Sequence, residues 1–461
     1  MNIPPVSRRQ LLRNASAGFG WLALSGMIAE QATAKPVPRV RRVIFCFMDG
    51  GPSHVDTFDP KPMLKKHEGK RVGDHSTNTL YNSPSRVWLG SPWKFEQRGK
   101  SGLWVSDLFP HLAEIADELC VIRSMVGMQP LHGQQNLLTH TGRVLGQHPS
   151  LGAWVSYGLG TENRNLPGYV LLNNDWVPNG GMENFSSAYL PTTHQATMIR
   201  AKGEGVDNIK PADATSLQRR KLAILAAQNA AFAKQSSSSA AIEAAIGNYE
   251  TAFRMQTLLP EITDISREPA HIQAMYGVGS KDKHQNYYAM QALRARRLAE
   301  RGVRFIEITC PSFDGNNSPW DQHGQLKTKH EKNARITEQS VAALIIDLKR
   351  RGMLDDTLVL WAGEMGRTPH TPRVTPSCGR DHHVNGYTIF MAGGGVRGGM
   401  TYGSTNEFGE AVADNPLTVH DIHATILHQL GVDHEQLTFR HGGRDHRLTD
   451  VHGSVIKKIL L

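Results

Sequence analysis

The chain reads RFIEIT over Arg304–Thr309 and then, after a short loop, WDQH over Trp320–His323. The first run is rich in β-branched and aromatic residues, which predicts a short strand. The second run supplies a carboxylate and an imidazole, the ligand types that Zn²⁺, Mn²⁺ and related divalent ions prefer. Together they predict a strand whose carboxyl end leads into a metal-binding loop.

Runs of the same kind recur along the chain and predict further strands at Val43–Met48, Cys120–Ser124, Tyr169–Leu172, Thr357–Trp361 and Tyr387–Met391. Apolar residues at helical spacing predict helices between them, at Leu108–Leu119, Tyr287–Leu298, Ala342–Leu348 and Val419–Leu430. Strands that alternate with helices indicate an α/β fold, in which helices cover both faces of a mainly parallel sheet. Ligands bind such sheets beyond the carboxyl ends of the strands.

Two more acid/histidine clusters adjoin predicted strands. Glu364 follows Thr357–Trp361, and the run Asp381-His382-His383 precedes Tyr387–Met391. We therefore expect these residues to form one site with Asp321 and His323, and to hold a divalent ion. The sequence leaves the ion open among Zn²⁺, Ca²⁺, Mg²⁺ and Mn²⁺. The competing interpretation is a set of loop salt bridges and solvated histidines.

Residues 1–34 predict an export signal. Paired arginines at Arg8-Arg9 precede a mildly apolar stretch, Ala15–Ala29, and the small residues of Ala32–Ala34. This arrangement resembles a twin-arginine signal peptide that is cleaved before Lys35. It implies contact with the twin-arginine translocation machinery, a periplasmic or extracellular location, and no transmembrane anchor after cleavage. An ordinary amphipathic N-terminal helix is the alternative.

The bulk composition limits the choice of partner. The 461 residues carry a formal net charge of +9, which favours anionic partners. No dense Lys/Arg run with interleaved aromatic residues appears, so nucleic-acid binding is not expected. The four cysteines show no Cys-x-x-Cys spacing, which argues against a disulfide framework or a zinc ribbon. A disulfide between Cys310 and Cys378 stays open.

Residues from about 200 to 300 differ from the rest of the chain. They are rich in Ala, Gln and Lys and predict a helical insertion packed on the sheet, which would cover the site. The serine run Ser236–Ser239 allows a second interpretation, a flexible linker between domains. The first interpretation makes residues 35–461 one domain.

Six phrases, taken in order, resemble a family of exported bacterial proteins of unknown function that is itself similar to sulfatases and alkaline phosphatases. The phrases are Gly50–Pro62, Leu151–Gly160, Trp320–His323, Gly363–Pro369, Gly379–His382 and His420–Leu427. The resemblance implies a three-layer α/β/α sandwich over residues 35–461. It also implies an exported, metal-dependent hydrolase that acts on phosphate or sulfate esters, with an anionic small molecule or polysaccharide ester as substrate.

The same resemblance distributes the ligands over two subsites. One holds Asp321, His323 and His382, and the other holds Glu364 with an acid from the first strand. That acid is Asp49, which directly follows the strand, or Asp56, which belongs to the family phrase. Asp381 would ligate or would orient an imidazole. His383 would be a spare ligand or would steer the substrate.

The sequence differs from that of the related enzymes at the position of the nucleophile. Relatives use Cys, Ser or Thr just before a helix that ends in Thr-Gly-Arg, and here His132 stands at the position that precedes Thr141–Arg143. His132 could act as nucleophile, metal ligand or proton donor, or could only cap a helix. Ser53 and Ser124 are fallback nucleophiles that lie elsewhere in the pattern.

The sequence leaves open the role of two arginines and whether the protein is a catalyst. Arg367 and Arg380 suit bidentate binding of phosphate or sulfate oxygens, or pairing with Glu364 or Asp381. The missing hydroxyl or thiol leaves an alternative to catalysis, namely an exported binding or structural protein with a metal-built anion pocket.

Overall fold

A large mixed sheet forms the centre of the protein. The computed structural model describes residues 38–73, 85–174, 176–202, 205–207, 209–210, 213–235 and 239–461, although not the side chains of residues 233–241. Within these ranges eight strands pair in the order β14-β5-β13-β9-β1-β8-β6-β7. Their bounds are β1 Arg42–Phe47, β5 Leu119–Met125, β6 Tyr169–Asn173, β7 Thr197–Arg200, β8 Phe305–Thr309, β9 Thr357–Ala362, β13 Tyr387–Gly393 and β14 Met400–Tyr402.

Most of the sheet is parallel. Strand β1 pairs in parallel with β8 and with β9, and β6 pairs in parallel with β7 and β8. Strand β13 runs antiparallel to both β9 and β5. The strands that flank β13 therefore share one direction, and the carboxyl ends of β1, β5, β8 and β9 meet at the same edge. The prediction of an α/β fold with a mainly parallel sheet is confirmed.

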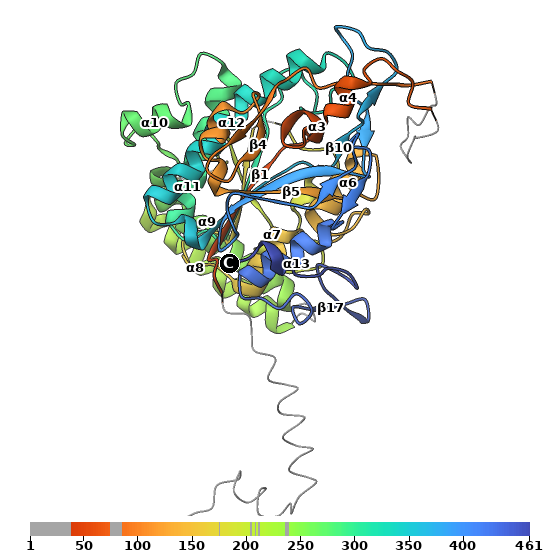
Figure 1. Ribbon diagram of the computed structural model, residues 1–461. Helices are drawn as coiled ribbons and strands as arrows, with labels where there is room; N and C mark the ends of the chain where they lie inside the picture. Colours follow the sequence, from red (N-terminus) through yellow and green to blue (C-terminus); the bar gives the residue numbers. More distant parts are fainter. Residues whose placement is uncertain are drawn as a thin grey trace, which may run out of the picture.

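Helices cover both faces of the sheet (Figure 1). Alternate residues of β1 point to opposite sides, so Ile44 and Cys46 join one apolar cluster while Val43 and Phe45 join the other. The first cluster is completed by α5 Pro110–Glu114, α9 Ser239–Thr263, α10 Ala270–Tyr276, α11 Lys283–Glu300 and α12 Leu326–Arg350. The second is completed by α7 Leu151–Leu159 and α13 Val419–Gln429. These are the three layers of the predicted sandwich.

Shorter elements surround the carboxyl edge of the sheet. The helices there are α3 His54–Thr57, α4 Pro62–Lys66 and α6 His132–Thr141. The short strands of the molecule pair as β2 Val87–Trp88 with β11 His370–Thr371, β3 Phe95–Arg98 with β4 Leu103–Ser106, β10 Gly366–Arg367 with β12 His382–His383, β15 Ser404–Thr405 with β16 Val412–Asp414, and β17 Phe439–His441 with β18 Arg444–His446.

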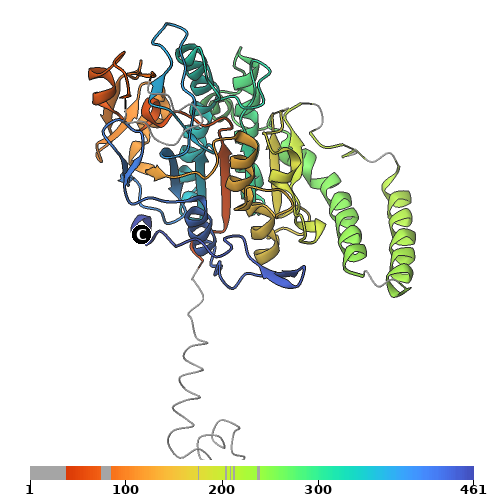
Figure 2. The same cartoon turned by 90° about the vertical axis from the view of Figure 1, so that its right-hand side faces the viewer.

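The helical segment predicted between about 200 and 300 has two parts. Helices α8 Thr215–Gln235 and α9 pack on each other at one side of the molecule, where Figure 2 shows them as a light green pair. Two side chains of α9, Asn248 and Arg254, donate hydrogen bonds to Thr192 and Arg164 on the body of the protein. The second half of α9, together with α10 and α11, packs in the apolar cluster on one face of the sheet. The run Ser236–Ser239, which suggested a linker, lies almost wholly outside the described residues.

Two helices differ from their predicted bounds. The segment Leu108–Leu119 splits into α5 and a 3-10 turn at Ala116–Glu118, because the Asp117 carboxylate accepts hydrogen bonds from the backbone N–H groups of Lys100 and Ser101. Helix α12 begins at Leu326, well before the predicted Ala342. Its first half is rich in Lys and Glu, so the apolar spacing that marks its second half is weak there.

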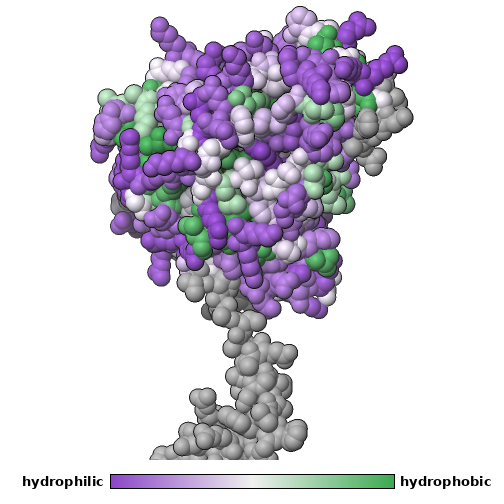
Figure 3. Space-filling view, in the orientation of Figure 1, coloured by the Kyte–Doolittle hydropathy of each residue, from purple (hydrophilic) through white to green (hydrophobic). Residues whose placement is uncertain are grey.

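The surface and the thiols add two findings. Hydrophilic side chains cover most of the face in Figure 3, with hydrophobic ones scattered among them. No helix in the described part of the chain is both long and apolar enough to cross a membrane. Cys310 and Cys378 are free thiols, which answers the question that the sequence left open.

Candidate functional site

The cluster of acids and histidines forms because several segments end at one edge of the sheet. Asp49 directly follows β1, Glu364 follows β9, and Asp321 lies in the loop after β8. His132 is the first residue of α6, which comes after β5. His382 lies on β12, just before β13, and the antiparallel direction of β13 brings its start to the edge where the parallel strands end.

Two groups of potential metal ligands share one residue. In the first group His132, Asp321 and His382 each offer one ligand atom, and all three atoms lie within 4.8 Å of one another. In the second group Asp49, His132 and Glu364 do the same. His132 Nδ1 lies 2.5 Å from Glu364 Oε1, and its Nε2 lies 3.4 Å from Asp321 Oδ2. His132 therefore stands between the two groups.

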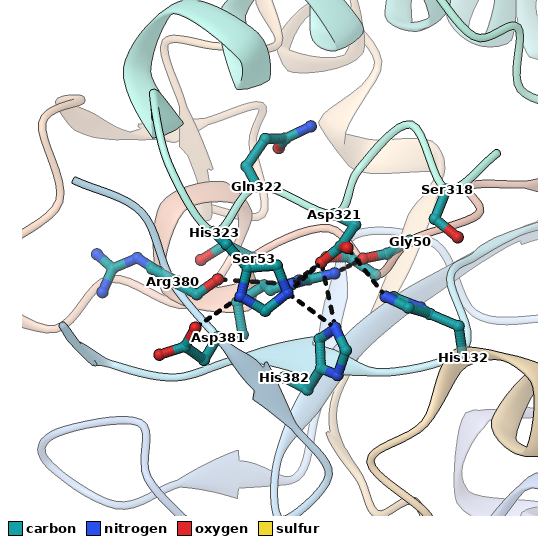
Figure 4. A network of polar contacts seen from close by, with 12 residues as sticks. Gly50, Ser53, His132, Ser318, Asp321, Gln322, His323, Arg380, Asp381 and His382 are labelled. Carbon is teal, nitrogen blue, oxygen red and sulfur yellow. Dashed lines mark hydrogen bonds and ion pairs between the residues drawn. The ribbon is translucent and has the colours of Figure 1, made fainter. Parts of the chain in front are cut away.

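Asp321 is the centre of the first group (Figure 4). Its Oδ1 lies 2.9 Å from His323 Nε2, 3.2 Å from His382 Nε2 and 2.5 Å from Arg367 Nη1. Burial alone would raise the pKa of the Asp321 carboxyl, but Arg367 and the neighbouring imidazoles outweigh it and hold the pKa far below its usual range.

Hydrogen bonds fix the orientation of two imidazoles. His323 Nδ1 lies 2.6 Å from Asp381 Oδ1, and His382 Nδ1 lies 2.6 Å from the carbonyl oxygen of Pro130. Because these acceptors take the Nδ1–H, the Nε2 atoms of both rings are turned toward Asp321. Hydrogen bonds to Asp321 and then Asp381 raise the pKa of His323 to about 9, whereas burial lowers that of His382.

The second group is the more buried one. Asp49 is 2% exposed and Glu364 is fully buried. Asn136 Nδ2 donates to Asp49 Oδ1 at 3.1 Å, while Asp49 Oδ2 has no hydrogen-bond partner among the described residues. Burial, followed by repulsion from Glu364, raises the pKa of Asp49 well above its usual value. For His132, burial lowers the pKa, but Asp321 and Glu364 outweigh it and raise the pKa to about 9.

Two glycines let the β1 loop approach the cluster. Gly50 has φ +103°, and a Cβ built on it would lie 2.5 Å from the backbone nitrogen of Asp321. Gly51 has φ +74° and would crowd Met365 in the same way. The Gly50 N–H donates to both carboxylate oxygens of Glu364, at 3.1 and 3.0 Å. The turn after β1 thereby holds Glu364 in place.

The structure places Asp56 and Arg380 outside the cluster, in contact with each other. Arg380 Nε donates to Asp56 Oδ2 at 2.6 Å, its Nη2 donates to Oδ1 at 3.1 Å, and both residues are fully buried. Burial would raise the pKa of Asp56, but Arg380 outweighs it and lowers the pKa. Asp49, rather than Asp56, is the first-strand acid beside Glu364. The Arg380 guanidinium is occupied, so it faces a carboxylate and not an open anion site.

The remaining candidates divide between the cluster and its surroundings. Arg367 is buried against Asp321 and the carbonyl oxygens of Gly50 and Gly51, and does not pair with Glu364. Asp381 is in neither ligand group, but its carboxylate accepts a hydrogen bond from His323 and so orients that ring. His383 points to the opposite side of β12 from His382, and its ring stacks on His54.

The two fallback nucleophiles also lie outside both groups. Ser53 Oγ donates to Asp56 Oδ2 at 2.6 Å, so its hydroxyl is already engaged. Ser124 is fully buried within β5. Of the described hydroxyl groups, Ser318 Oγ comes near the second group, 3.5 Å from Asp49 Oδ1.

Two residues of the site escaped the sequence analysis. Asn136, which donates to Asp49, lies four positions after His132 on α6 and thus on the same helix face, a spacing that could have revealed it. Arg86 donates to Asp381 Oδ2 and to His370 Nδ1, and it carries no comparable signal because it lies in a loop far from both partners in sequence.

Comparisons with known proteins add a family and a set of distant structural likenesses. A family model described as "Protein of unknown function (DUF1501)" matches residues 40–460. No curated protein matches the sequence.

Three solved structures illustrate these likenesses. The PsFucS1 sulfatase from Pseudoalteromonas sp. is 12% identical, with 90% of this chain and 72% of that chain covered and a TM-score of 0.36. The lipoteichoic acid synthase LtaP from Listeria monocytogenes is 8% identical, with 90% and 75% covered and a TM-score of 0.34. The alkaline phosphatase from the Antarctic bacterium TAB5 is 9% identical, with 81% and 96% covered and a TM-score of 0.36.

Proposed function

Since the chain belongs to this family of proteins of unknown function, we propose its activity from the site itself: a metal-dependent hydrolase of phosphate or sulfate esters. One observation carries the proposal. Two groups of carboxylates and imidazoles meet at His132, at the edge of the sheet where α/β proteins bind their ligands.

The donor atoms fit a divalent cation. Carboxylate oxygens and imidazole nitrogens in groups of three, with room for further ligands, are typical of catalytic Zn²⁺ and related ions. Asp49 Oδ2 is buried without a partner, and its neighbour Glu364 is a second buried carboxylate. A cation at this position would compensate both charges. Either Asp49, His132 and Glu364 or His132, Asp321 and His382 would hold an ion, because a neutral imidazole has one ring nitrogen free to act as a ligand.

The ion would supply Lewis acidity, which polarises a phosphoryl or sulfuryl oxygen and acidifies water. The protein's own residues position the groups around it. Asp381 and Pro130 hold His323 and His382 with their Nε2 atoms toward Asp321, and Gly50 holds Glu364. The His323 side chain is 37% exposed, against 10% for His132, so an ester enters from the His323 side.

His132 acts as a ligand in this proposal. Each of its ring nitrogens faces one group, Nδ1 toward Glu364 and Nε2 toward Asp321. The nucleophile in this proposal is water, which attacks the ester directly, so no covalent intermediate forms. Hydrolysis breaks the bond from phosphorus or sulfur to the leaving oxygen, which takes up a proton.

The missing hydroxyl nucleophile also supports a second function, an exported binding protein with a metal-built anion pocket. Metal analysis followed by a screen of chromogenic phosphate and sulfate esters separates the two. Turnover by the wild type that Asp321→Ala abolishes supports the hydrolase. Bound metal with ester affinity but no turnover supports the binding protein, and a metal-free protein after careful purification overturns both.

We propose further that the protein works outside the cytoplasm. Arg8-Arg9 and the small residues Ala32–Ala34 support export by the twin-arginine route with cleavage before Lys35. All of these residues lie outside the described part of the chain. Proteins on this route cross the membrane already folded, which is compatible with a metal that is loaded before export.

A further inference from the structure

A cavity separate from the metal-ligand groups opens at the same edge of the sheet. It has a volume of about 370 Å³ and is lined by Asn174, Lys202 and Ser312 among others. These three residues directly follow β6, β7 and β8 or lie within a few positions of their ends. The cavity is therefore a neighbour of the candidate site, displaced along the sheet toward β7.

Two residues that line this cavity each carry a buried polar atom without a hydrogen-bond partner among the described residues. Asn174 and Ser312 are 3% and 6% exposed. Asn174 Nδ2 donates to the carbonyl oxygen of Thr309 at 2.5 Å, which identifies Oδ1 as the acceptor of that amide. Neither Asn174 Oδ1 nor Ser312 Oγ has a hydrogen-bond partner among the described residues. Buried polar atoms are rarely left unpaired, so these two point to a ligand that carries hydroxyl groups.

The rim of the cavity is basic and aromatic. Lys202 and Lys283 are exposed there, and none of the described lining residues is acidic. Two carboxylates adjoin lining residues in the sequence: Asp282 caps α11 by accepting from the His284 N–H at 3.0 Å, and Asp314 Oδ2 lies 2.9 Å from Lys329 Nζ. The rings of Trp176 and Tyr287 form part of the wall, and Trp176 is 42% exposed. A sugar ring stacks on such aromatic surfaces, and the lysines attract negative charge.

We infer that this cavity is a subsite for an anionic sugar unit, such as a sulfated or carboxylated pyranose, of the ester that the metal-ligand site hydrolyses. A sugar hydroxyl donates to Asn174 Oδ1, Ser312 Oγ bonds to another, and Lys202 and Lys283 contact the anionic group. The inference rests on the proposed function for its reaction, but the binding it describes does not depend on turnover.

The two sites are close enough for one extended molecule. Ser318 Oγ lies 3.5 Å from Asp49 Oδ1. The chain from Ser312 to Ser318 spans at most about 20 Å when fully extended, so the floor of the cavity lies within that reach of the second ligand group. An oligosaccharide of a few units covers this span, which makes its charged groups part of substrate recognition.

The test measures binding by the full chain after its metal has been removed with a chelator, so that a failed hydrolase proposal does not affect the result. Sucrose octasulfate is the probe, with sucrose and inorganic sulfate as reference ligands, in isothermal titration calorimetry. The double variant Lys202→Gln/Lys283→Gln is compared with Lys100→Gln/Lys458→Gln, which removes two exposed lysines elsewhere. Ser312→Ala removes the unpaired hydroxyl alone.

We expect the wild type to bind sucrose octasulfate and the first double variant to lose about tenfold in affinity, as for two partly exposed charge contacts. The control double variant keeps its affinity. Ser312→Ala binds several-fold more weakly with an unchanged melting temperature, because its hydroxyl makes no internal bond. Equal losses in both double variants, unchanged binding by Ser312→Ala, or equally tight binding of sucrose or of sulfate alone overturns the inference.

Discussion

His132 Nδ1 lies 2.5 Å from Glu364 Oε1, although 232 positions separate the two residues in the chain. The contact joins the start of α6 to the residues that follow β9. The predictions below test what this arrangement does.

Replacing His132 separates its possible roles. We expect His132→Ala to lose metal and ester hydrolysis together, because the residue belongs to both ligand groups. Metal by elemental analysis and turnover of a chromogenic ester are the two measurements, with His428→Ala as a matched control away from the cluster. Lost activity with full metal content would instead make His132 a group that acts on the substrate, and full retention of both would refute any role at the site.

Removing the first ligand group should weaken metal binding in steps. Asp321→Ala removes a direct donor, and we expect it to abolish stoichiometric metal. Asp381→Ala removes the acceptor of His323, whose Nε2 lies 2.9 Å from Asp321, and of Arg86; for the loss of such an indirect partner, about 10–100-fold in metal affinity is the usual effect. Competition with a fluorescent chelator measures both. The exposed Asp355→Ala serves as control, and affinities that do not differ from wild type contradict the assignment.

The buried pair of Asp56 and Arg380 should contribute more to the free energy of unfolding than an exposed ion pair does. Arg380→Ala leaves the fully buried Asp56 carboxylate without its partner, which costs about 3–5 kcal/mol in the free energy of unfolding. The exposed pair of Arg440 and Asp445 provides the control, since Arg440→Ala should cost at most about 1 kcal/mol. Urea denaturation monitored by tryptophan fluorescence compares the two, and similar losses would contradict the prediction.

The ionisation of Asp56 should make the free energy of unfolding depend on pH. Its folded-state pKa is lowered, with Arg380 outweighing burial, so its ionisation stabilises the fold above the unfolded pKa of about 4. This contribution is lost as the pH falls through the folded pKa. We therefore expect the difference in unfolding free energy between the wild type and Asp56→Asn to be constant above about pH 5 and to shrink below about pH 4. A difference that grows on acidification has the wrong sign for this mechanism.

Export is tested by changing the paired arginines alone. Arg8→Lys/Arg9→Lys should leave the unprocessed precursor in the cytoplasm, because the twin-arginine route depends on both side chains. Immunoblotting of cell fractions follows the change in mass on cleavage before Lys35. Lys35→Arg is a control that keeps the charge. Continued processing of the double variant through the same route would refute the twin-arginine assignment.

The six inner strands of the large sheet could be predicted from the sequence because each is a short apolar run between turn residues, whereas the edge strands Thr197–Arg200 and Met400–Tyr402 are short and only partly apolar and were not predicted. Thr357–Trp361 was predicted and Thr357–Ala362 is observed. The site could be predicted only in part. Parallel strands bring Asp49 and Glu364 to one edge, but nothing local shows that Asp56 faces Arg380 or that Arg86 faces Asp381. Such pairings depend on how distant loops pack.

The dispersal of the ligands along the chain has a consequence for biogenesis. Asp49 is made early and His382 late, and β13, which brings His382 to the edge, follows it directly. No fragment that ends before β13 can assemble both ligand groups. Metal binding in which both groups take part would require a chain that is complete through β13.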